Sequence, residues 1–258
     1  MKKFTSALLA VTALTAANVF AAGAVDSKTG AYLGGNVGAG NTNVKYGYVM
    51  GGNTNNGTTA LPAAQTNNTK FEGGKMNPLF GLFAGYGMQV GTMYFGGEVY
   101  GGFDSAKVTP YDDAATGASA SAFFTTKVKR TNFYGIAPRV GAFITPSTML
   151  YVKLGIEGGK WESTVTNSPN AGNGVALTSN AKGPFKSSKS GISFAPGLGL
   201  DAFITKNLFL RAEYSYLFGP KIKFVQDGKV NNSYSGTEIA HDLKITQQTF
   251  KVGVGYKF

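Results

Sequence analysis

Residues 198–218 read LGLDAFITKNLFLRAEYSYLF and hold two strand-like runs on either side of a tight turn at residues 205–207. Leu198 and Leu200 lie on one face of the first run, and glycine or aspartate fills the alternate positions. The second run repeats this two-residue period, with Arg211 on the face opposite the apolar side chains. Because successive side chains of a β-strand point to opposite faces, the stretch predicts a hairpin with one apolar face.

The rest of the chain repeats this plan. Alternating runs of about ten residues flank two further short turns, at residues 89–92 and 145–148. Single runs near Ala31 and at Thr246–Phe258 complete a set of eight strands, three short turns and four longer loops. The loops are rich in Asn, Thr, Ser, Gly and Lys, and we expect them approximately at Tyr46–Asn77, Ser105–Thr125, Glu162–Ser188 and Gly219–Leu243.

Period-two alternation fits two architectures, a closed barrel that spans a membrane and a soluble β-sandwich with one wet face. Strands of about nine to eleven residues match a tilted bilayer crossing, and strict alternation of short turns with long loops places all long loops on one side. An even strand number closes without a free edge. Interfacial aromatic girdles are supplied by residues near the strand ends, among them Tyr86, Tyr214, Tyr216 and Tyr256. We therefore predict an all-β fold, an eight-stranded antiparallel up-and-down transmembrane β-barrel with an N-terminal signal peptide.

The first residues predict export. Lys2 and Lys3 are followed by an apolar run at Leu8–Ala17 and then by small residues, which is the order of a secretory signal peptide. The apolar run is about half as long as the ~20 residues that a membrane-spanning helix needs, so it is not an anchor. We expect a cleaved signal peptide at residues 1–21, with the exact cleavage site open, and the barrel at residues 22–258. This places the mature protein in the cell outer membrane.

Composition limits the classes of function. The chain has no cysteine, which removes disulfides and thiolate metal sites, and we expect neither a metal nor a cofactor. The formal net charge is +11. An exported protein rarely meets nucleic acid, so anionic lipid headgroups and lipopolysaccharide phosphates are the expected partners of this charge. Scattered loop lysines that keep the surface soluble explain the charge equally well.

The alternation turns four acidic and four basic side chains toward the inside of the barrel. These lumen residues are Glu98, Arg139, Lys153, Glu157, Asp201, Arg211, Glu213 and Lys251. Asp201 lies directly opposite Arg211 across the third short turn, and Arg139 lies diagonally between Lys153 and Glu157, within cross-strand reach. An unpaired charge in a narrow interior is costly, so we expect these residues to form pairs.

Two interpretations of this lumen compete. Paired charges can plug it, because eight strands leave little more than side-chain room. Alternatively, the same charges gate or select ions in a small pore. Inward glycines are expected to make space for four bulky side chains, Arg139, Arg211, Tyr94 and Phe83.

Three stretches carry a resemblance to a known family: AYLGGNVGAG at residues 31–40, the hairpin at residues 198–218, and FKVGVGYKF at residues 250–258. They look like strands of the small outer-membrane barrels of Gram-negative bacteria. This superfamily includes the transmembrane domain of outer membrane protein A and the short porin-like surface antigens. The resemblance covers the strands along essentially the whole mature chain, whereas the loops match nothing recognisable.

The closing stretch also matches the family's C-terminal assembly signal, which ends on an aromatic residue. The matching positions are Lys251, Gly253, Tyr256 and Phe258. The resemblance implies that the barrel assembly machinery of the outer membrane recognises this segment.

The sequence assigns no catalytic residue. Hydrolytic chemistry usually needs a histidine within reach of a nucleophile or an activated water, and the only histidine is His241, beside Asp242 in the expected fourth loop. The alternation places no strand serine beside it, so we interpret His241 as a loop residue. No metal site is expected from one histidine and no cysteine.

A modest alternative site lies at the outer rim, where Arg130 and Lys160 fall on the lipid-facing side near the loop ends of adjacent strands. They are positioned to meet lipopolysaccharide phosphates, and ordinary snorkelling to the headgroups explains them equally well. We predict a monomer with a structural or surface-interactive role: membrane integrity, adhesion, or display as an antigen that meets host surface molecules. The alternative function is a narrow porin or small-solute channel.

Overall fold

The protein, seen in a computed structural model, is described for residues 28–51, 71–112, 124–167, 185–230 and 234–258. The predicted signal peptide lies outside these residues. Within them, no helix is long and apolar enough to cross a membrane. The regular elements are the strands β1 (Gly30–Gly51), β2 (Phe71–Val90), β3 (Met93–Asp104), β4 (Lys107–Asp112), β5 (Phe124–Thr145), β6 (Thr148–Asn167), β7 (Phe185–Phe203), β8 (Leu208–Val230) and β9 (Tyr234–Lys257).

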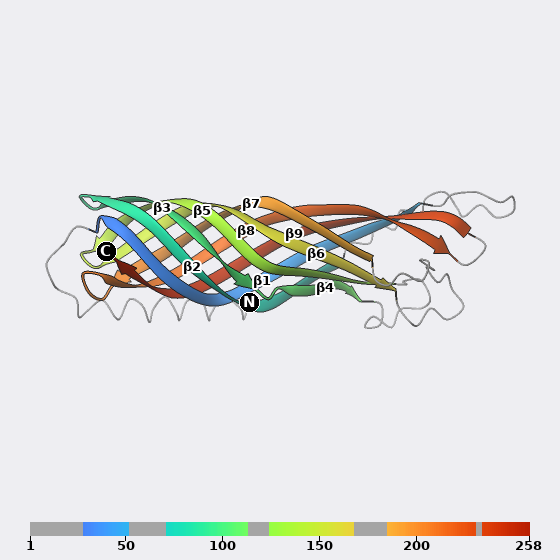
Figure 1. Ribbon diagram of the computed structural model, residues 1–258, viewed down its shortest axis with the longest axis horizontal. Helices are drawn as coiled ribbons and strands as arrows, with labels where there is room; N and C mark the ends of the chain where they lie inside the picture. Colours follow the sequence, from blue (N-terminus) through green and yellow to red (C-terminus); the bar gives the residue numbers. More distant parts are fainter. Residues whose placement is uncertain (1–27, 52–70, 113–123, 168–184, 231–233) are drawn as a thin grey trace.

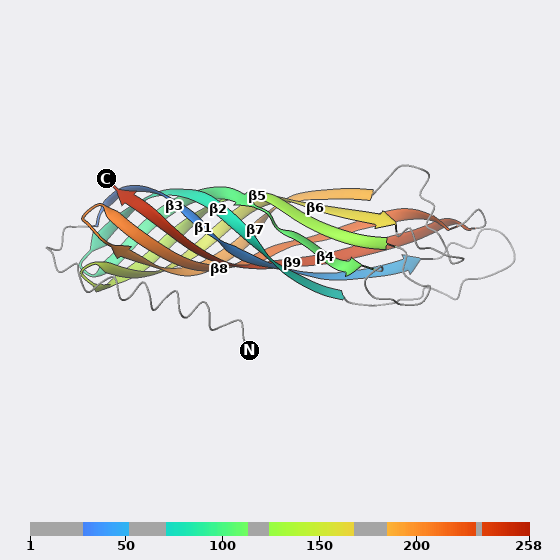
Figure 2. The ribbon, with the colours of Figure 1, turned by 90° about the horizontal axis from the view of Figure 1, so that it is seen from below.

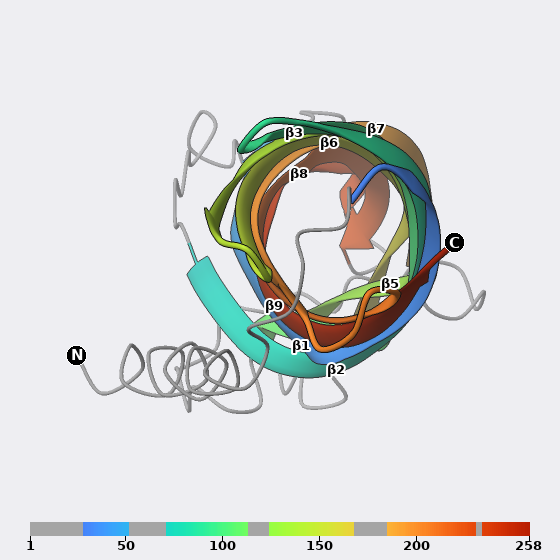
Figure 3. The same ribbon diagram turned by 90° about the vertical axis from the view of Figure 1, so that its left-hand side faces the viewer.

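The strands form one antiparallel sheet in the order β3-β2-β1-β9-β8-β7-β6-β5-β4, which an additional β3–β5 pairing closes into a ring. Figures 1 and 2 show the ring from its sides, and Figure 3 shows it from one end. β3 and β4 are two parts of one barrel strand, because Phe103 pairs with Asn132 and Lys107 pairs with Lys129, both on β5. The predicted eight-stranded antiparallel barrel is confirmed, with one strand in two pieces.

The two ends of the barrel differ. The three short turns, at residues 91–92, 146–147 and 204–207, gather at the end that also holds the C-terminus (Figure 1). We call this the turn end and the opposite one the loop end. Around the turn-end half, outward side chains are apolar and exposed on every barrel strand. This apolar belt includes Leu33, Leu82, Val99, Ile136, Leu154, Leu198, Tyr214 and Val254.

The strands are longer than predicted. Apart from β3 and β4 they run for 19 to 24 residues, so the expected length of about nine to eleven residues is wrong. Much of the predicted fourth loop, Gly219–Leu243, is strand. The alternation continues beyond the belt, but its outward positions become polar: Trp161 and Val165 are buried, while Lys160 and Thr166 are exposed. An apolar outward face therefore marks only the turn-end part of each strand, and the predicted strands end before the real ones.

At the loop end the ring opens along two seams. Among the described residues, pairing between β7 and β8 stops at Phe194 opposite Phe218, and pairing between β2 and β3 stops at Leu79 opposite Asp104. The first seam begins beside Pro220, which has no N–H to donate to a ladder. Beyond the seams, β2-β1-β9-β8 form one sheet and β4-β5-β6-β7 form a second, which is visible as the flattened right-hand part of Figure 1.

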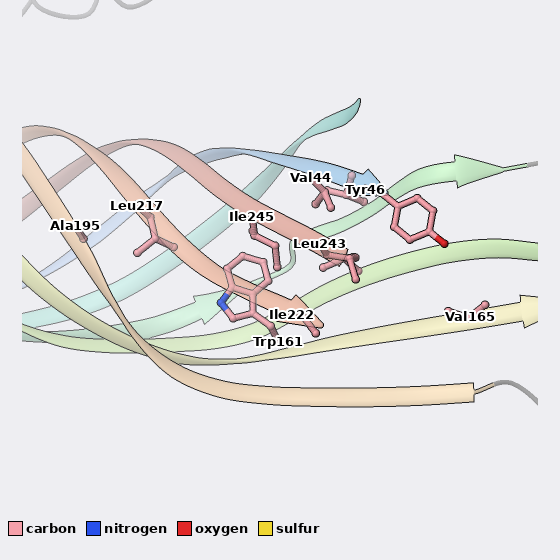
Figure 4. Close-up of a cluster of buried hydrophobic side chains, with 11 residues drawn as sticks. Val44, Tyr46, Trp161, Val165, Ala195, Leu217, Ile222, Leu243 and Ile245 are labelled. Carbon is pink, nitrogen blue, oxygen red and sulfur yellow. The ribbon is translucent and has the colours of Figure 1, made fainter. Parts of the chain in front are cut away.

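The space between these two sheets is filled by apolar side chains (Figure 4). Full burial of one Val, Leu or Ile side chain contributes roughly 1.5–3 kcal/mol, so packing between the sheets replaces ring closure as the source of order here. We call this cluster the loop-end core. It consists of Val44, Tyr46, Val108, Val128, Trp161, Val165, Ala195, Leu217, Ile222, Leu243 and Ile245.

Replacing Leu243, which is fully buried in the loop-end core, is expected to loosen the loop-end half selectively. Leu243→Ala should lower the protection of nearby β8 and β9 amides against hydrogen exchange by about 2–5 kcal/mol, the usual cost of such a cavity. Amides within the belt should keep their protection. Lys244→Ala is the matched control, because Lys244 is the exposed neighbour on the same strand. Equal effects of the two variants would contradict the loop-end core.

Candidate functional site in the barrel lumen

The charged cluster nearest the turn end alternates two arginines with two carboxylates. Arg211 binds Asp201 with two hydrogen bonds, from Nε to Oδ1 at 2.8 Å and from Nη2 to Oδ2 at 3.1 Å. Its Nη1 donates to Glu98 Oε2 at 2.6 Å. Arg139 bridges the same two carboxylates, at 2.9 Å to Asp201 and 3.2 Å to Glu98, and also donates to the Tyr32 hydroxyl. Each guanidinium is thus neutralised within the lumen.

Aromatic rings pack against both guanidinium groups. Arg139 Cζ lies 3.7 Å from the centroid of the Tyr151 ring, and Arg211 Cζ lies 4.0 Å from that of Phe83. Inward glycines leave room for these rings: a Cβ on Gly199 would lie 2.4 Å from Tyr151, and one on Gly34 would lie 2.3 Å from Phe83. The glycines therefore accommodate the aromatic rings, and the rings in turn confine the arginines.

The second charged cluster surrounds Glu213, which lies two residues beyond Arg211 on β8 and therefore further from the short turns. Glu213 Oε1 accepts a hydrogen bond from Lys153 Nζ at 2.6 Å and lies 3.8 Å from Lys251 Nζ. The Tyr151 hydroxyl donates to the other oxygen of Glu213 at 3.0 Å. Lys153 Nζ also lies 4.4 Å from the centroid of the Tyr100 ring. One carboxylate thus holds two ammonium groups and a phenol, and all three residues with a formal charge are buried.

The third charged cluster surrounds Arg130 on β5. This residue was expected on the lipid-facing side, yet only 2% of it is exposed. Its Nη2 binds Glu157 at 2.5 Å, and its Nη1 binds Gln247 at 2.8 Å and lies 3.6 Å from Asp104. A bulge causes the reversal: Arg130 pairs with Trp161, but the next pair is Phe133 with Gly159, so β5 contains one residue more than β6. An extra residue turns every following side chain to the other face.

Lys160, the other predicted rim residue, is exposed on the outer face and forms an ion pair with Glu162 at 3.1 Å. The structure therefore separates the two residues that the sequence placed together. Arg130 belongs to the lumen, and Lys160 remains at the surface.

All eight predicted lumen residues are buried, and Arg130 and Asp104 form a further charge pair inside the lumen. Asp104 continues the inward row of Glu98 and Tyr100 on β3, so the two-residue period contained the signal that identifies it. The pairing differs in part from the prediction. Asp201 does meet Arg211, whereas Arg139 binds Glu98 on the adjacent strand β3 and Asp201 on β7 instead of Glu157.

The clusters leave little empty space. A cavity of about 10 Å³ lies beside Arg130 and Glu157, and another of about 10 Å³ lies beside Asp201 and Arg211. Each has room for roughly one water molecule. The arrangement is a stack of neutralised charges, with hydrogen bonds joining opposite walls of the barrel.

His241 lies on β9 within the loop-end half, so its assignment to a loop near the membrane rim is wrong. It is 2% exposed. Its Nδ1 lies 2.7 Å from the Tyr46 hydroxyl, and its ring stacks on Phe224 with centroids 4.6 Å apart. Burial lowers the pKa of His241 from 6.5 to about 4, because this apolar surrounding disfavours the charged imidazolium. His241 is therefore neutral at pH 7.

The four residues of the predicted assembly signal divide between the two faces of β9. Lys251 points into the lumen, and Gly253 lies against the backbone of β1, where a Cβ would meet the Gly35 carbonyl oxygen at 2.5 Å. Tyr256 and Phe258 are exposed, and their ring centroids lie 5.2 Å apart. An external partner can therefore reach the aromatic pair but not the lysine.

Removing the carboxylate of Glu213 should destabilise the barrel. Glu213→Gln leaves Lys153 and Lys251 close together without their anion, and breaking a buried pair in this way costs about 3–5 kcal/mol. Equilibrium unfolding in urea with lipid vesicles measures the change. Glu162→Gln, which breaks the partly exposed pair with Lys160, is the control and should cost less than about 1 kcal/mol. A Glu213→Gln variant as stable as the control would refute the buried network.

Acid should weaken the loop-end half through His241. Because its folded pKa of about 4 lies below the ordinary value of 6.5, stability is complete above pH 6.5 and falls as the pH drops toward 4, by up to about 3 kcal/mol. Hydrogen exchange of β8 and β9 amides at pH 7 and pH 4.5 measures this loss in the wild type and in His241→Gln. The expected result is a smaller acid effect in the variant. An identical acid effect in both proteins would exclude His241 as its cause.

Comparison with known proteins places this geometry among outer-membrane proteins. A family model described as "Outer membrane protein beta-barrel domain" matches residues 6–258. The 25 kDa outer-membrane immunogenic protein of Brucella melitensis biotype 1 is 29% identical over 178 residues, which are 69% of this chain and 64% of that protein. The match thus spans slightly less than two thirds of the relative's length.

Two solved structures align at low identity. The outer membrane protein OprG from Pseudomonas aeruginosa aligns with a TM-score of 0.46 and 14% identity, covering 92% of this chain and 99% of that one. The attachment invasion locus protein Ail of Yersinia pestis aligns with a TM-score of 0.39 and 15% identity, covering 89% and 99%.

Proposed function

The chain belongs to the outer membrane protein β-barrel domain family, and we propose that it is a sealed outer-membrane barrel with a structural or surface-interactive role. The lumen is the observation that carries this proposal. Two of its three charged clusters join opposite walls, through Arg211 with Glu98 and Arg130 with Gln247, and the cavities of about 10 Å³ beside the clusters are too small for a hydrated ion. An ion would have to break pairs whose loss costs about 3–5 kcal/mol each.

The loop-end half supports the surface role. It continues the barrel beyond the apolar belt with a polar outer face and an apolar core. A rigid projection of this kind presents its loops to the exterior for adhesion, for contact with host surface molecules, or for display as an antigen. The name of the Brucella relative, an immunogenic protein of the outer membrane, agrees with the last of these roles.

Export and assembly complete the proposal. A signal peptide at residues 1–21 directs the chain across the inner membrane and is then removed. The barrel assembly machinery binds the exposed aromatic pair Tyr256 and Phe258, while Lys251 enters the lumen during folding. The mature protein is a monomer without a catalytic role, and His241 serves the loop-end core through its contacts with Tyr46 and Phe224.

Single-channel recording in a planar bilayer tests the sealed lumen. Refolded protein, whose insertion is verified by its heat-dependent shift on a denaturing gel, should produce no stepwise current. Reproducible steps in the wild type would contradict the proposal and favour the alternative, a narrow porin. Glu213→Gln and Glu162→Gln then identify the origin of any current, because only the first residue faces the lumen. A lumen current changes ion selectivity with Glu213→Gln alone.

A further inference from the structure

Two prolines interrupt the hydrogen-bond ladders of the barrel wall within the apolar belt. The pairing of β5 with β6 has a gap at Pro138, which lies level with Leu154, and the pairing of β7 with β8 has a gap at Pro196, level with Tyr216. Proline has no N–H, so the carbonyl opposite each of them lacks its ladder donor. Hydrocarbon offers no replacement, which makes such gaps costly inside a membrane. Within the belt, the pairings β1–β2, β2–β3, β3–β5, β1–β9 and β8–β9 of the described strands run without a gap of this kind.

The two gaps lie on either side of one pair of strands, β6 and β7. Between these two strands the pairing runs unbroken, from Thr148 opposite Ala202 to Val165 opposite Phe185. Short turns join the pair to β5 and β8 at the turn end, and at the loop end β7 is no longer paired with β8 beyond Phe194 (Figure 1). We call β6 and β7 the panel and the other strands the frame. The panel is thus continuous within itself and is joined to the frame by two interrupted ladders.

Buried ion pairs cross both of these boundaries. Asp201 on β7 binds Arg139 on β5 at 2.9 Å and Arg211 on β8 at 2.8 Å. One panel carboxylate is therefore joined to both neighbouring frame strands. Two further pairs cross the boundaries, namely Lys153 on β6 with Glu213 on β8, and Glu157 on β6 with Arg130 on β5.

Glu98 on β3 holds the same two guanidinium groups from the frame. Its Oε2 lies 3.2 Å from Arg139 and 2.6 Å from Arg211. Both arginines therefore keep a carboxylate partner when Asp201 moves away. Because a buried charge without a partner is what makes the loss of an ion pair expensive, Glu98 lowers the cost of separating the panel from the frame.

We propose that the panel separates from the barrel wall as one unit, hinged at the turn end, and that Asp201 is its latch. The two ladders that lack a donor are the weakest boundaries of the belt, and the ion pairs across them set how often the panel opens. The rest of the ring, whose ladders have no such gap, stays closed. The lumen charges thus hold a movable part of the wall in place as well as filling the interior. The inference uses strand pairing and side-chain contacts alone, so it stands apart from whether the closed barrel conducts ions.

Amide hydrogen exchange of the full chain in lipid vesicles tests the panel, with matched variants of the two carboxylates. Asp201→Asn removes the latch and should speed exchange at the β5–β6 and β7–β8 boundaries about tenfold or more, while amides bonded between β6 and β7 keep their wild-type rates. Glu98→Gln takes a carboxylate from the same two arginines on the frame, and it should speed exchange at these boundaries no more than at the β1–β9 pairing. Equal boundary effects of the two variants, or a uniform rise across the belt in Asp201→Asn, would overturn the proposal.

Proline replacements test the panel in the opposite direction and remove no buried charge. Pro138→Ala and Pro196→Ala each supply the missing N–H and should slow exchange at their own boundary by about 3- to 10-fold, the net contribution of one hydrogen bond. Pro110→Ala, on β4 and outside both boundaries, should leave exchange there as in the wild type. Unchanged boundary exchange in both belt variants, or equal slowing by Pro110→Ala, would exclude the panel. These variants decide the question if Asp201→Asn does not fold.

Discussion

Backbone hydrogen bonding is the constraint on which the structure depends. Hydrocarbon offers no partner for a free N–H or C=O group, so strands that cross it must close into a ring. The pairing of β1 with β9 and of β3 with β5 achieves this closure within the belt. The constraint ends where water begins, and the ring opens there: pairing between β7 and β8 stops at Phe218, one of the outermost apolar residues on its strand.

The turn-end and loop-end halves of the molecule have opposite distributions of polar and apolar side chains between exterior and interior. Within the belt the exterior is apolar and the interior holds charged clusters, because the lumen cannot be filled by lipid and its charges must find partners inside. Beyond the belt the exterior carries lysines, and the interior is the loop-end core around Trp161. The bulge after Arg130 lies at this transition and turns its guanidinium into the lumen, where it closes the charged stack.

The local pattern predicted most of the fold, including the three short turns, the faces of the strands and the register of Asp201 with Arg211. It failed where the cause was not local. The strands extend into the loop-end half, where their inward residues form the loop-end core and their outward residues are polar, so the apolar face alone did not predict their length. The position of Arg130 depended on one extra residue in β5. Arg139 binds Glu98 on the adjacent strand β3 and Asp201 on β7, two strands away, and a two-residue period identifies the face of a residue but not which inward residues of other strands it meets.

Spin-label accessibility along β6 tests the central claim, a charged lumen enclosed by an apolar belt that gives way to polar outward side chains toward the loop end. The chain has no cysteine of its own, so labels can be attached at single cysteines introduced at Leu154, Ile156, Lys160 and Thr166. In lipid vesicles, oxygen should reach the labels at Leu154 and Ile156, and a water-soluble nickel chelate should reach those at Lys160 and Thr166. A chelate that reaches Leu154, or a label at Lys160 that remains in oxygen-rich lipid, would contradict the account.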